Sequence, residues 1–198
     1  MLDRKLIERA AGAIPSDERM VEKDWYVVRA IRIISALDHA GGMPAFSGGT
    51  SLSKGWGLIK RFSEDIDFKV AMKADVSGAQ ERKRRSAYRE QVLSALCATD
   101  FNLLVVKKGN ESRFFTADLA YDSHFESALK LRPHIRIEMS FIAPALKPIG
   151  RPIQSLIARF EKMPPEVSNF PCVDPVGTAA DKLSALAWRV CTRERSAL

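Results

Sequence analysis

Two aspartates separated by a single residue, Asp65 and Asp67, form the most informative short pattern in this sequence of 198 residues. On a β-strand, residues i and i+2 point to one face, so the two carboxylates project together while Ile66 and Phe68 enter the core. Two neighbouring carboxylates repel each other unless a cation lies between them. Hard oxygen ligands at this spacing suit Mg²⁺, which is commonly bound with substrate phosphates. The pattern predicts a divalent-metal site.

A glycine-rich turn precedes the aspartates, with the sequence Gly48-Gly49-Thr50-Ser51. Glycine lets main-chain N–H groups approach an anion closely, and the Thr50 and Ser51 hydroxyls can donate to phosphate oxygens. A helix that begins near Leu52 would add a favourable dipole. Alone, such a segment is more often a plain turn, but beside the aspartate pair it predicts a site for a triphosphate.

Glu138 is the candidate for a third carboxylate. The segment 134–141, HIRIEMSF, alternates polar and apolar residues, which is typical of a half-buried strand. Three carboxylates on neighbouring strands can hold two metal ions for in-line phosphoryl chemistry. The alternative is that Glu138 belongs to an ordinary solvated strand face.

The elements that must position these residues follow from hydrophobic periodicity and turn residues. We expect helices at 3–13, 17–38 and 80–98, strands at 66–70, 101–108, 112–121 and 134–141, two short helical stretches within the proline-rich segment 144–175, and a last helix from Thr178 to the chain end. This order predicts an α+β fold with a small mixed sheet flanked by helices.

Composition narrows the class of protein. Lys and Arg number 31 against 24 Asp and Glu, which gives a net charge of +7 and suggests a polyanionic partner such as nucleic acid. The three cysteines form no C-x-x-C motif or disulfide framework, which favours a reducing cytoplasm. The sequence contains neither an apolar run of membrane-spanning length nor an apolar signal-peptide region, so we expect no membrane association.

A basic cluster at the start of helix 80–98 is a possible nucleic-acid contact. Its members are Arg82, Lys83, Arg85 and Arg89. The alternative is a solvated helix start without a function in binding. Contacts with phosphates would make binding strongly dependent on salt.

The sequence resembles the AbiEii/AbiGii toxin family of nucleotidyltransferases, within the DNA polymerase β-like superfamily. The segments that carry the resemblance are GGTSLSK at 48–54 and RFSEDID at 61–67, with support from EKDW at 22–25, RIEM at 136–139 and DKLSAL at 181–186. The resemblance implies a polymerase β-like fold with N-terminal helices, and transfer of a nucleotide from an NTP with release of pyrophosphate. It also implies a toxin of a toxin–antitoxin or phage-abortive-infection system; some members modify the acceptor end of tRNA.

The resemblance also implies roles for single residues. Asp65 and Asp67 match the metal-binding carboxylates, and Gly49 and Ser51 match the phosphate-gripping turn. Arg61 and Ser63 match nucleotide-site positions before the aspartates, and Lys182 matches a lysine expected to contact the triphosphate.

Two departures from the family pattern affect the expectations. The third acidic position is Glu138, which reaches further than an aspartate would. The family also continues into a helical segment with an R-D-x-x-D motif, whereas this sequence ends at Leu198. We therefore expect a nucleotidyltransferase domain at 1–175 and the truncated start of a C-terminal helical segment at 176–198. The alternatives are that the motif is dispensable here or that the activity is impaired.

Together these features predict a nucleotidyltransferase that depends on Mg²⁺ or Mn²⁺, uses an NTP and acts on an acceptor hydroxyl, with RNA, and tRNA in particular, as the expected acceptor. A cognate antitoxin is the expected protein partner. Two alternatives stay open: a nucleotide-binding interaction module without transfer activity, and a transferase that acts on a small molecule.

Overall fold

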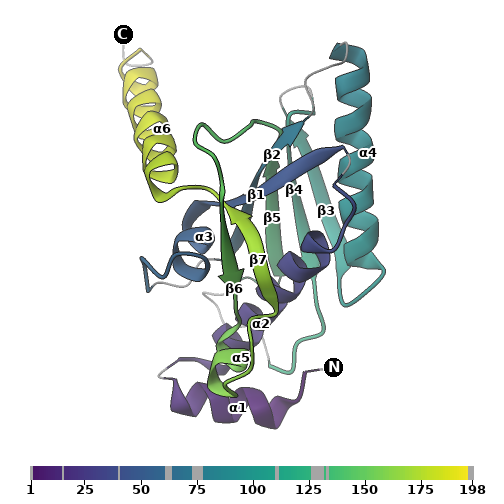
Figure 1. The fold of residues 1–198 in the computed structure, drawn as a ribbon, viewed down its shortest axis with the longest axis vertical. Coiled ribbons are helices and arrows are strands. Elements are labelled where there is room, and N and C mark those ends of the chain that lie inside the picture. The colour runs from purple at the N-terminus through teal and green to yellow at the C-terminus, as the bar shows by residue number, and fades with distance from the viewer. Residues whose placement is uncertain are drawn as a thin grey trace.

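A computed structural model of the chain describes residues 2–14, 16–39, 41–60, 64–72, 78–109, 112–125, 132 and 134–195. Within these ranges, one mixed sheet has the strand order β3-β4-β5-β2-β1-β7-β6 (Figure 1). Its strands are β1 (Gly42–Ser47), β2 (Asp65–Met72), β3 (Asn102–Gly109), β4 (Phe114–Ala120), β5 (His134–Ser140), β6 (Ile149–Ile153) and β7 (Val167–Cys172). The helices are α1 (Arg4–Ala13), α2 (Glu18–Ser35), α3 (Gly48–Lys54), α4 (Gly78–Cys97), α5 (Leu156–Phe160) and α6 (Pro175–Arg195).

Strand β2 lies in the middle of the sheet and gives it its mixed character. It pairs antiparallel with β1 and parallel with β5. Helix α3 fills the connection between β1 and β2, so the turn that begins this helix lies beside β2. The predicted α+β fold with a mixed sheet is therefore confirmed.

The hydrophobic core explains which face of the sheet carries the site. Alternation along β2 buries Ile66, Phe68 and Val70, whose exposed fractions are 0 to 2%. Helices α2 and α4 pack further core side chains against the sheet, including Ile31, Ile34, Tyr88, Val92 and Leu96. The opposite face of β2 and β5 carries the polar residues of both strands.

The proline-rich segment 144–175 is where the sequence-based prediction is wrong. Instead of two short helical stretches, it contains strands β6 and β7 with the single short helix α5 between them. Strand β1 was also not expected, because its glycine-rich surroundings and Pro44 disfavour a strand. Pro44 is tolerated because β7 pairs with β1 only at Phe46, so no strand lies beside Pro44 on that side.

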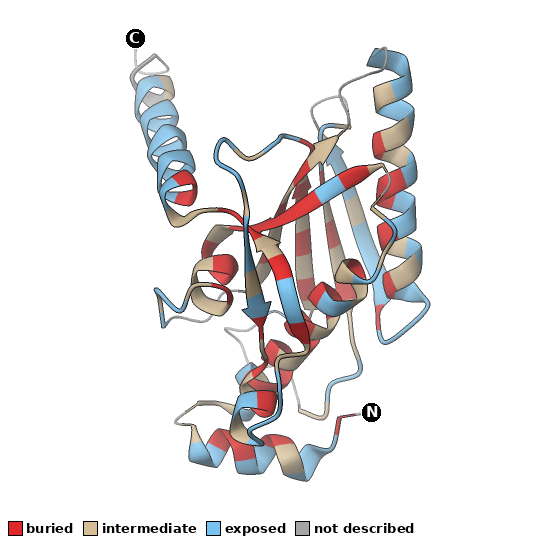
Figure 2. Ribbon diagram, in the orientation of Figure 1, coloured by how far each residue is buried: buried red, intermediate tan, exposed pale blue. Residues whose placement is uncertain are grey.

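Helix α6 extends away from the sheet, and most of its length is exposed (Figure 2). Its exposed apolar side chains include Leu183, Leu186 and Trp188. An ion pair of 2.6 Å between Lys69 Nζ and Asp181 Oδ2 ties its first turns to β2. None of the described helices has the length and apolar character needed to cross a bilayer.

Candidate active site

The two predicted metal-binding aspartates lie on the polar face of β2, next to the polar face of β5. The parallel register pairs Asp65 with Arg136 and Asp67 with Glu138. Asp67 and Glu138 are therefore direct neighbours across two strands, which is the juxtaposition that the sequence pattern predicted. The pairing is non-local, since Asp67 and Glu138 are 71 positions apart in the sequence.

The electrostatics of these carboxylates differ from those of ordinary surface acids. Burial, with the charges of Glu138 and Asp65, raises the pKa of Asp67 to about 7. Burial and the charge of Asp65 also raise the pKa of Glu138 above its usual range. A carboxylate held in this way is costly to ionise alone, and a bound cation would remove that cost.

Gly48 brings the predicted phosphate turn into direct contact with Asp67. Its φ of +71° lies in the left-handed region that favours glycine. A Cβ atom at this position would lie 1.8 Å from Asp67 Oδ2 and 2.9 Å from Asp67 Cβ. No other residue fits there without displacing the aspartate, so the turn and the carboxylate form one compact unit.

The hydroxyls of the turn are positioned differently from the expectation. Thr50 and Ser51 are buried, with exposed fractions of 2% and 0%. The Thr50 hydroxyl donates to the main-chain oxygen of Asp65, so it links α3 to β2. Helix α3 begins at Gly48, four residues before the predicted start near Leu52.

Lys182 approaches the carboxylates from α6. Its positive charge lowers the pKa of Asp67, although burial and the other carboxylates outweigh it. The Lys182 side chain is exposed, while its neighbour Asp181 holds the helix against β2. The structure therefore brings this predicted residue within electrostatic reach of Asp67. Arg61 and Ser63, the other predicted nucleotide contacts, lie outside the described residues.

Arg132 belongs to the site but was not expected from the sequence. Its Nη1 atom donates to Asp65 Oδ1 at 3.0 Å. Its main-chain N–H donates to Glu64 Oε2 at 3.1 Å. A basic residue just before the strand that carries Glu138 was the available signal, because a parallel neighbour of β2 starts beside Asp65.

A fourth carboxylate on the same face, Asp118, is paired with an arginine. Asp118 on β4 accepts two hydrogen bonds from Arg136, at 2.7 and 3.0 Å. These bonds hold the pKa of Asp118 below its usual range. Arg136 thus occupies both carboxylate oxygens of Asp118, whereas Arg132 bonds to Asp65 through Oδ1, so Asp118 is assigned as a structural ion-pair partner.

The donor chemistry of Asp65, Asp67 and Glu138 fits a divalent cation. All three offer hard carboxylate oxygens, and the raised pKa values of Asp67 and Glu138 reflect crowded negative charge. Among the described residues, no three metal-binding side chains already converge on one point. These residues therefore suit a divalent cation in their ligand chemistry and in the strand register that makes Asp67 and Glu138 neighbours.

The basic cluster of α4 divides into two parts. Arg82 and Lys83 are exposed. Arg85 and Arg89 are each only 3% exposed, and they bond to Glu81 and to the hydroxyl of Ser86 within the same helix. The first pair therefore lies at the protein surface, whereas the second pair is buried.

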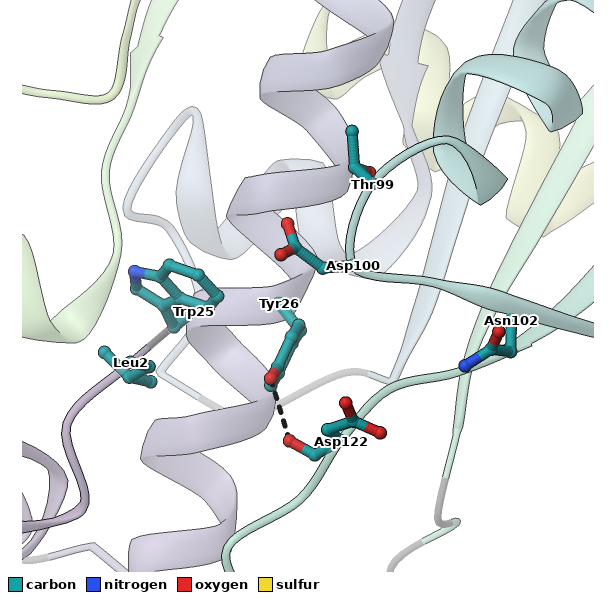
Figure 3. Close-up of a pocket in the computed structure, with 7 residues that line it drawn as sticks. All are labelled: Leu2, Trp25, Tyr26, Thr99, Asp100, Asn102 and Asp122. Atoms are coloured by element: carbon teal, nitrogen blue, oxygen red, sulfur yellow. Dashed lines mark hydrogen bonds between the residues drawn. The ribbon is translucent and has the colours of Figure 1, made fainter.

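A small cavity of about 190 Å³ lies apart from these carboxylates. Its lining residues are Leu2, Trp25, Tyr26, Thr99, Asp100, Asn102 and Asp122 (Figure 3). Two of these lining residues are joined, because the Tyr26 hydroxyl donates to the main-chain oxygen of Asp122 at 2.8 Å. None of the predicted site residues lines this cavity.

Comparison with known proteins places the fold and the family. The family model described as the nucleotidyl transferase AbiEii toxin of a type IV toxin–antitoxin system matches residues 32–197. The structure of MenT4, a nucleotidyltransferase toxin from Mycobacterium tuberculosis H37Rv, superposes with a TM-score of 0.60 and 19% identity. The alignment covers 93% of this chain and 59% of MenT4, and it indicates a shared fold.

Two further comparisons add little. The Cid1 poly(U) polymerase structure superposes with a TM-score of 0.35 and 16% identity, over 69% of this chain and 36% of that one, too loosely to inform the fold. No curated protein matches the sequence.

Proposed function

Because the chain belongs to the AbiEii family of nucleotidyl transferase toxins, we propose that it moves a nucleotide from an NTP to an acceptor hydroxyl. One observation carries the proposal: the glycine turn at Gly48 abuts Asp67, which in turn neighbours Glu138 across the β2–β5 pair. A turn suited to phosphates and a set of crowded carboxylates therefore meet at one place.

Asp65, Asp67 and Glu138 would hold Mg²⁺ or Mn²⁺. The metal would supply charge neutralisation on the triphosphate and a lower pKa for the acceptor hydroxyl. The crowding of negative charge around Asp67 supports this assignment, since the charge of Lys182 does not outweigh burial, Glu138 and Asp65 within the described part of the chain.

The triphosphate would lie against the turn at Gly48 and Gly49, where main-chain N–H groups can approach an anion. Lys182 would then neutralise charge on the departing pyrophosphate. The electrostatic reach of Lys182 to Asp67 supports this role. Contacts from Arg61 and Ser63 remain predictions from the sequence, whereas the hydroxyls of Thr50 and Ser51 are buried and that of Thr50 donates to the main chain of Asp65.

The acceptor is proposed to be RNA, with tRNA as the first candidate. The net charge of +7 and the exposed pair Arg82 and Lys83 support attraction of a polyanion. The toxin family of a toxin–antitoxin system supports a cognate antitoxin as the protein partner.

The test incubates the chain with each labelled NTP, Mg²⁺ and total tRNA, and we expect label in RNA that EDTA abolishes. The Asp65→Ala, Asp67→Ala double variant should lose this labelling. Asp100→Asn is the matched control, because its carboxylate pairs with Arg29 and contributes nothing to the site. Equal labelling by the double variant would contradict the assigned site.

The same preparation separates the alternatives. NTP binding by calorimetry without turnover on any acceptor would identify a nucleotide-binding interaction module. Label that appears in small molecules and not in RNA would identify a different acceptor class. For RNA, binding should weaken steeply between 50 and 200 mM salt, since phosphate contacts release counterions, with losses on the order of tenfold or more.

A further inference from the structure

Three consecutive charged residues of α2, Glu22, Lys23 and Asp24, are buried at 1%, 0% and 2% exposure. Charged side chains are almost never buried to this extent unless they are paired. Consecutive residues of a helix point in different directions, so these three charges reach three different parts of the fold.

Glu22 and Asp24 bind elements away from the carboxylate site. Glu22 accepts bonds from the Ser123 hydroxyl at 2.6 Å and the His124 N–H at 2.8 Å. Asp24 forms an ion pair with Lys54 at the end of α3 and accepts from the Leu156 N–H at 2.7 Å. These contacts attach α2 to a loop and to two short helices.

Lys23 instead reaches the residues that flank Asp65. Its Nζ atom donates to Glu64 Oε2 at 2.6 Å and to the main-chain oxygen of Arg132 at 2.8 Å. The same Glu64 oxygen accepts the Arg132 N–H at 3.1 Å. The guanidinium of Arg132 then donates to Asp65 at 3.0 Å. One buried ammonium thus connects two chain segments at the place where Asp65 begins β2.

This network sets the register of the two strands that carry the carboxylates. Glu64 immediately precedes β2, and Arg132 lies two residues before β5. Holding these two points together fixes the start of the parallel pair in which Asp67 faces Glu138. If one of these strands slipped by one residue, its carboxylate side chains would turn to the opposite face of the sheet.

We propose that Lys23 is a positioning residue for the carboxylate site, acting through Glu64 and Arg132 on Asp65. It touches no reacting atom. Its link to catalysis rests on the proposed nucleotidyl transfer, whereas its effect on metal affinity does not.

The first test is Lys23→Met, which keeps an unbranched chain and removes the charge and both hydrogen bonds. We expect Mn²⁺ affinity, measured by electron paramagnetic resonance, to fall about tenfold or more. The kcat for nucleotide transfer should fall about 10²-fold, while the KM for NTP changes less than about threefold. Arg29→Met is the matched control, since it breaks an exposed ion pair of the same helix with Asp100 and should leave all three values unchanged.

A second pair of variants covers the case in which Lys23→Met does not fold. The Glu64 side chain is 24% exposed, so Glu64→Ala should fold. It should reproduce the loss of Mn²⁺ affinity and kcat. Glu64→Gln should recover most of both, because its carbonyl oxygen can accept the same two bonds. A merely structural role would lower the Tm of all these variants without this division between Ala and Gln.

The outcomes separate the two proposals. If the wild type binds Mn²⁺ but transfers no nucleotide, the proposed function fails, and the Mn²⁺ affinities alone decide the role of Lys23. A folded Lys23→Met or Glu64→Ala variant whose Mn²⁺ affinity stays within about threefold of wild type would overturn the positioning role. A wild type that binds no Mn²⁺ would overturn it together with the metal assignment.

Discussion

Asp67 and Asp118 lie on the same face of one sheet, yet their surroundings shift their pKa values in opposite directions. Asp118 receives both arms of the Arg136 guanidinium, and its pKa lies below the usual range. Asp67 lies among Glu138, Asp65 and the Gly48 turn, and its pKa rises to about 7. The comparison teaches that the neighbours of a carboxylate, and not its presence on a strand, mark a cation site.

The largest effect should come from exchanging each aspartate for asparagine. Asp67→Asn should lower kcat by about 10³-fold, because a neutral amide cannot hold the metal that stabilises the transferred phosphoryl group. Asp118→Asn should cost less than about tenfold, since its charge serves Arg136. Steady-state transfer assays compare the two, and equal losses would remove the distinction between them.

The next effect concerns the glycine that packs on only one of the two aspartates. Gly48→Ala should lower kcat by about 10²-fold, because the new Cβ atom would overlap Asp67 Oδ2 and displace the carboxylate. It should also destabilise the fold by about 1–3 kcal/mol through backbone strain. Chemical denaturation measures the second quantity.

Gly57→Ala is the matched control for that change. Gly57 also has a positive φ, of +65°, but a Cβ atom there would meet nothing within 4 Å. The substitution should cost about 1 kcal/mol from strain and leave kcat within about twofold. Loss of activity in both variants would show that strain, and not contact with Asp67, is responsible.

In the absence of metal, replacing Asp67 and replacing Asp118 by asparagine should change the Tm in opposite directions. The folded-state pKa of Asp67 is raised, so its stabilising contribution is complete below about pH 4 and is lost as the pH rises through about 7. Asp67→Asn should therefore raise the Tm at pH 8 by about 2–4 °C or more, and the gain should vanish toward pH 4.

Asp118 should behave in the opposite way. Its folded-state pKa is lowered, so its stabilising contribution is present at neutral pH and is lost as the pH falls through the folded value. Asp118→Asn should lower the Tm at pH 7, with a cost on the order of 1–3 kcal/mol for losing a charged hydrogen-bond pair, and the deficit should shrink toward pH 4. Differential scanning fluorimetry in EDTA from pH 4 to 8 tests both curves, and matching signs would contradict the comparison.

The smallest effect involves Lys182, whose charge reaches Asp67 from α6. Lys182→Ala should raise the pKa of Asp67 by a few tenths, because the opposing positive charge is removed. The pKa of Asp118 should not move. Carbon NMR titration of labelled aspartate carboxyls in EDTA measures the pKa of both groups in one experiment. An unchanged pKa of Asp67 would contradict the placement of Lys182 near the site.

The pattern of the sequence predicts the strand faces on which the candidate carboxylates lie. Alternation of polar and apolar residues in 65–68 and 134–141 depends only on the period of a strand, so it assigns Asp65, Asp67 and Glu138 to polar faces without knowledge of the fold. Hydrophobic periodicity likewise indicates the helices that cover the other face. Where this signal is weak, as in segment 144–175, strands β6 and β7 were missed, because their stability comes from pairing with each other and with β1.

The buried charges of α2 show the limit of the same approach. On a helix, three adjacent charges usually indicate a solvated surface, and the sequence offers no local sign that Lys23 is buried. Its partners, Glu64 and Arg132, lie 41 and 109 residues further along the chain. Their meeting depends on the packing of α2 against the ends of two strands.

By itself, the sequence determined the chemistry available to this protein: paired carboxylates on a strand, a glycine turn and a basic surface. Those features follow from residue type and local spacing, because the geometry of a strand or a turn sets the direction in which each side chain points. Only the tertiary structure decided which carboxylate is crowded and which is satisfied, because the charges that set their pKa values come from other strands and helices. Electrostatic interactions depend on distance in space, and strand pairing alone brings Asp67 to Glu138 and Arg136 to Asp118.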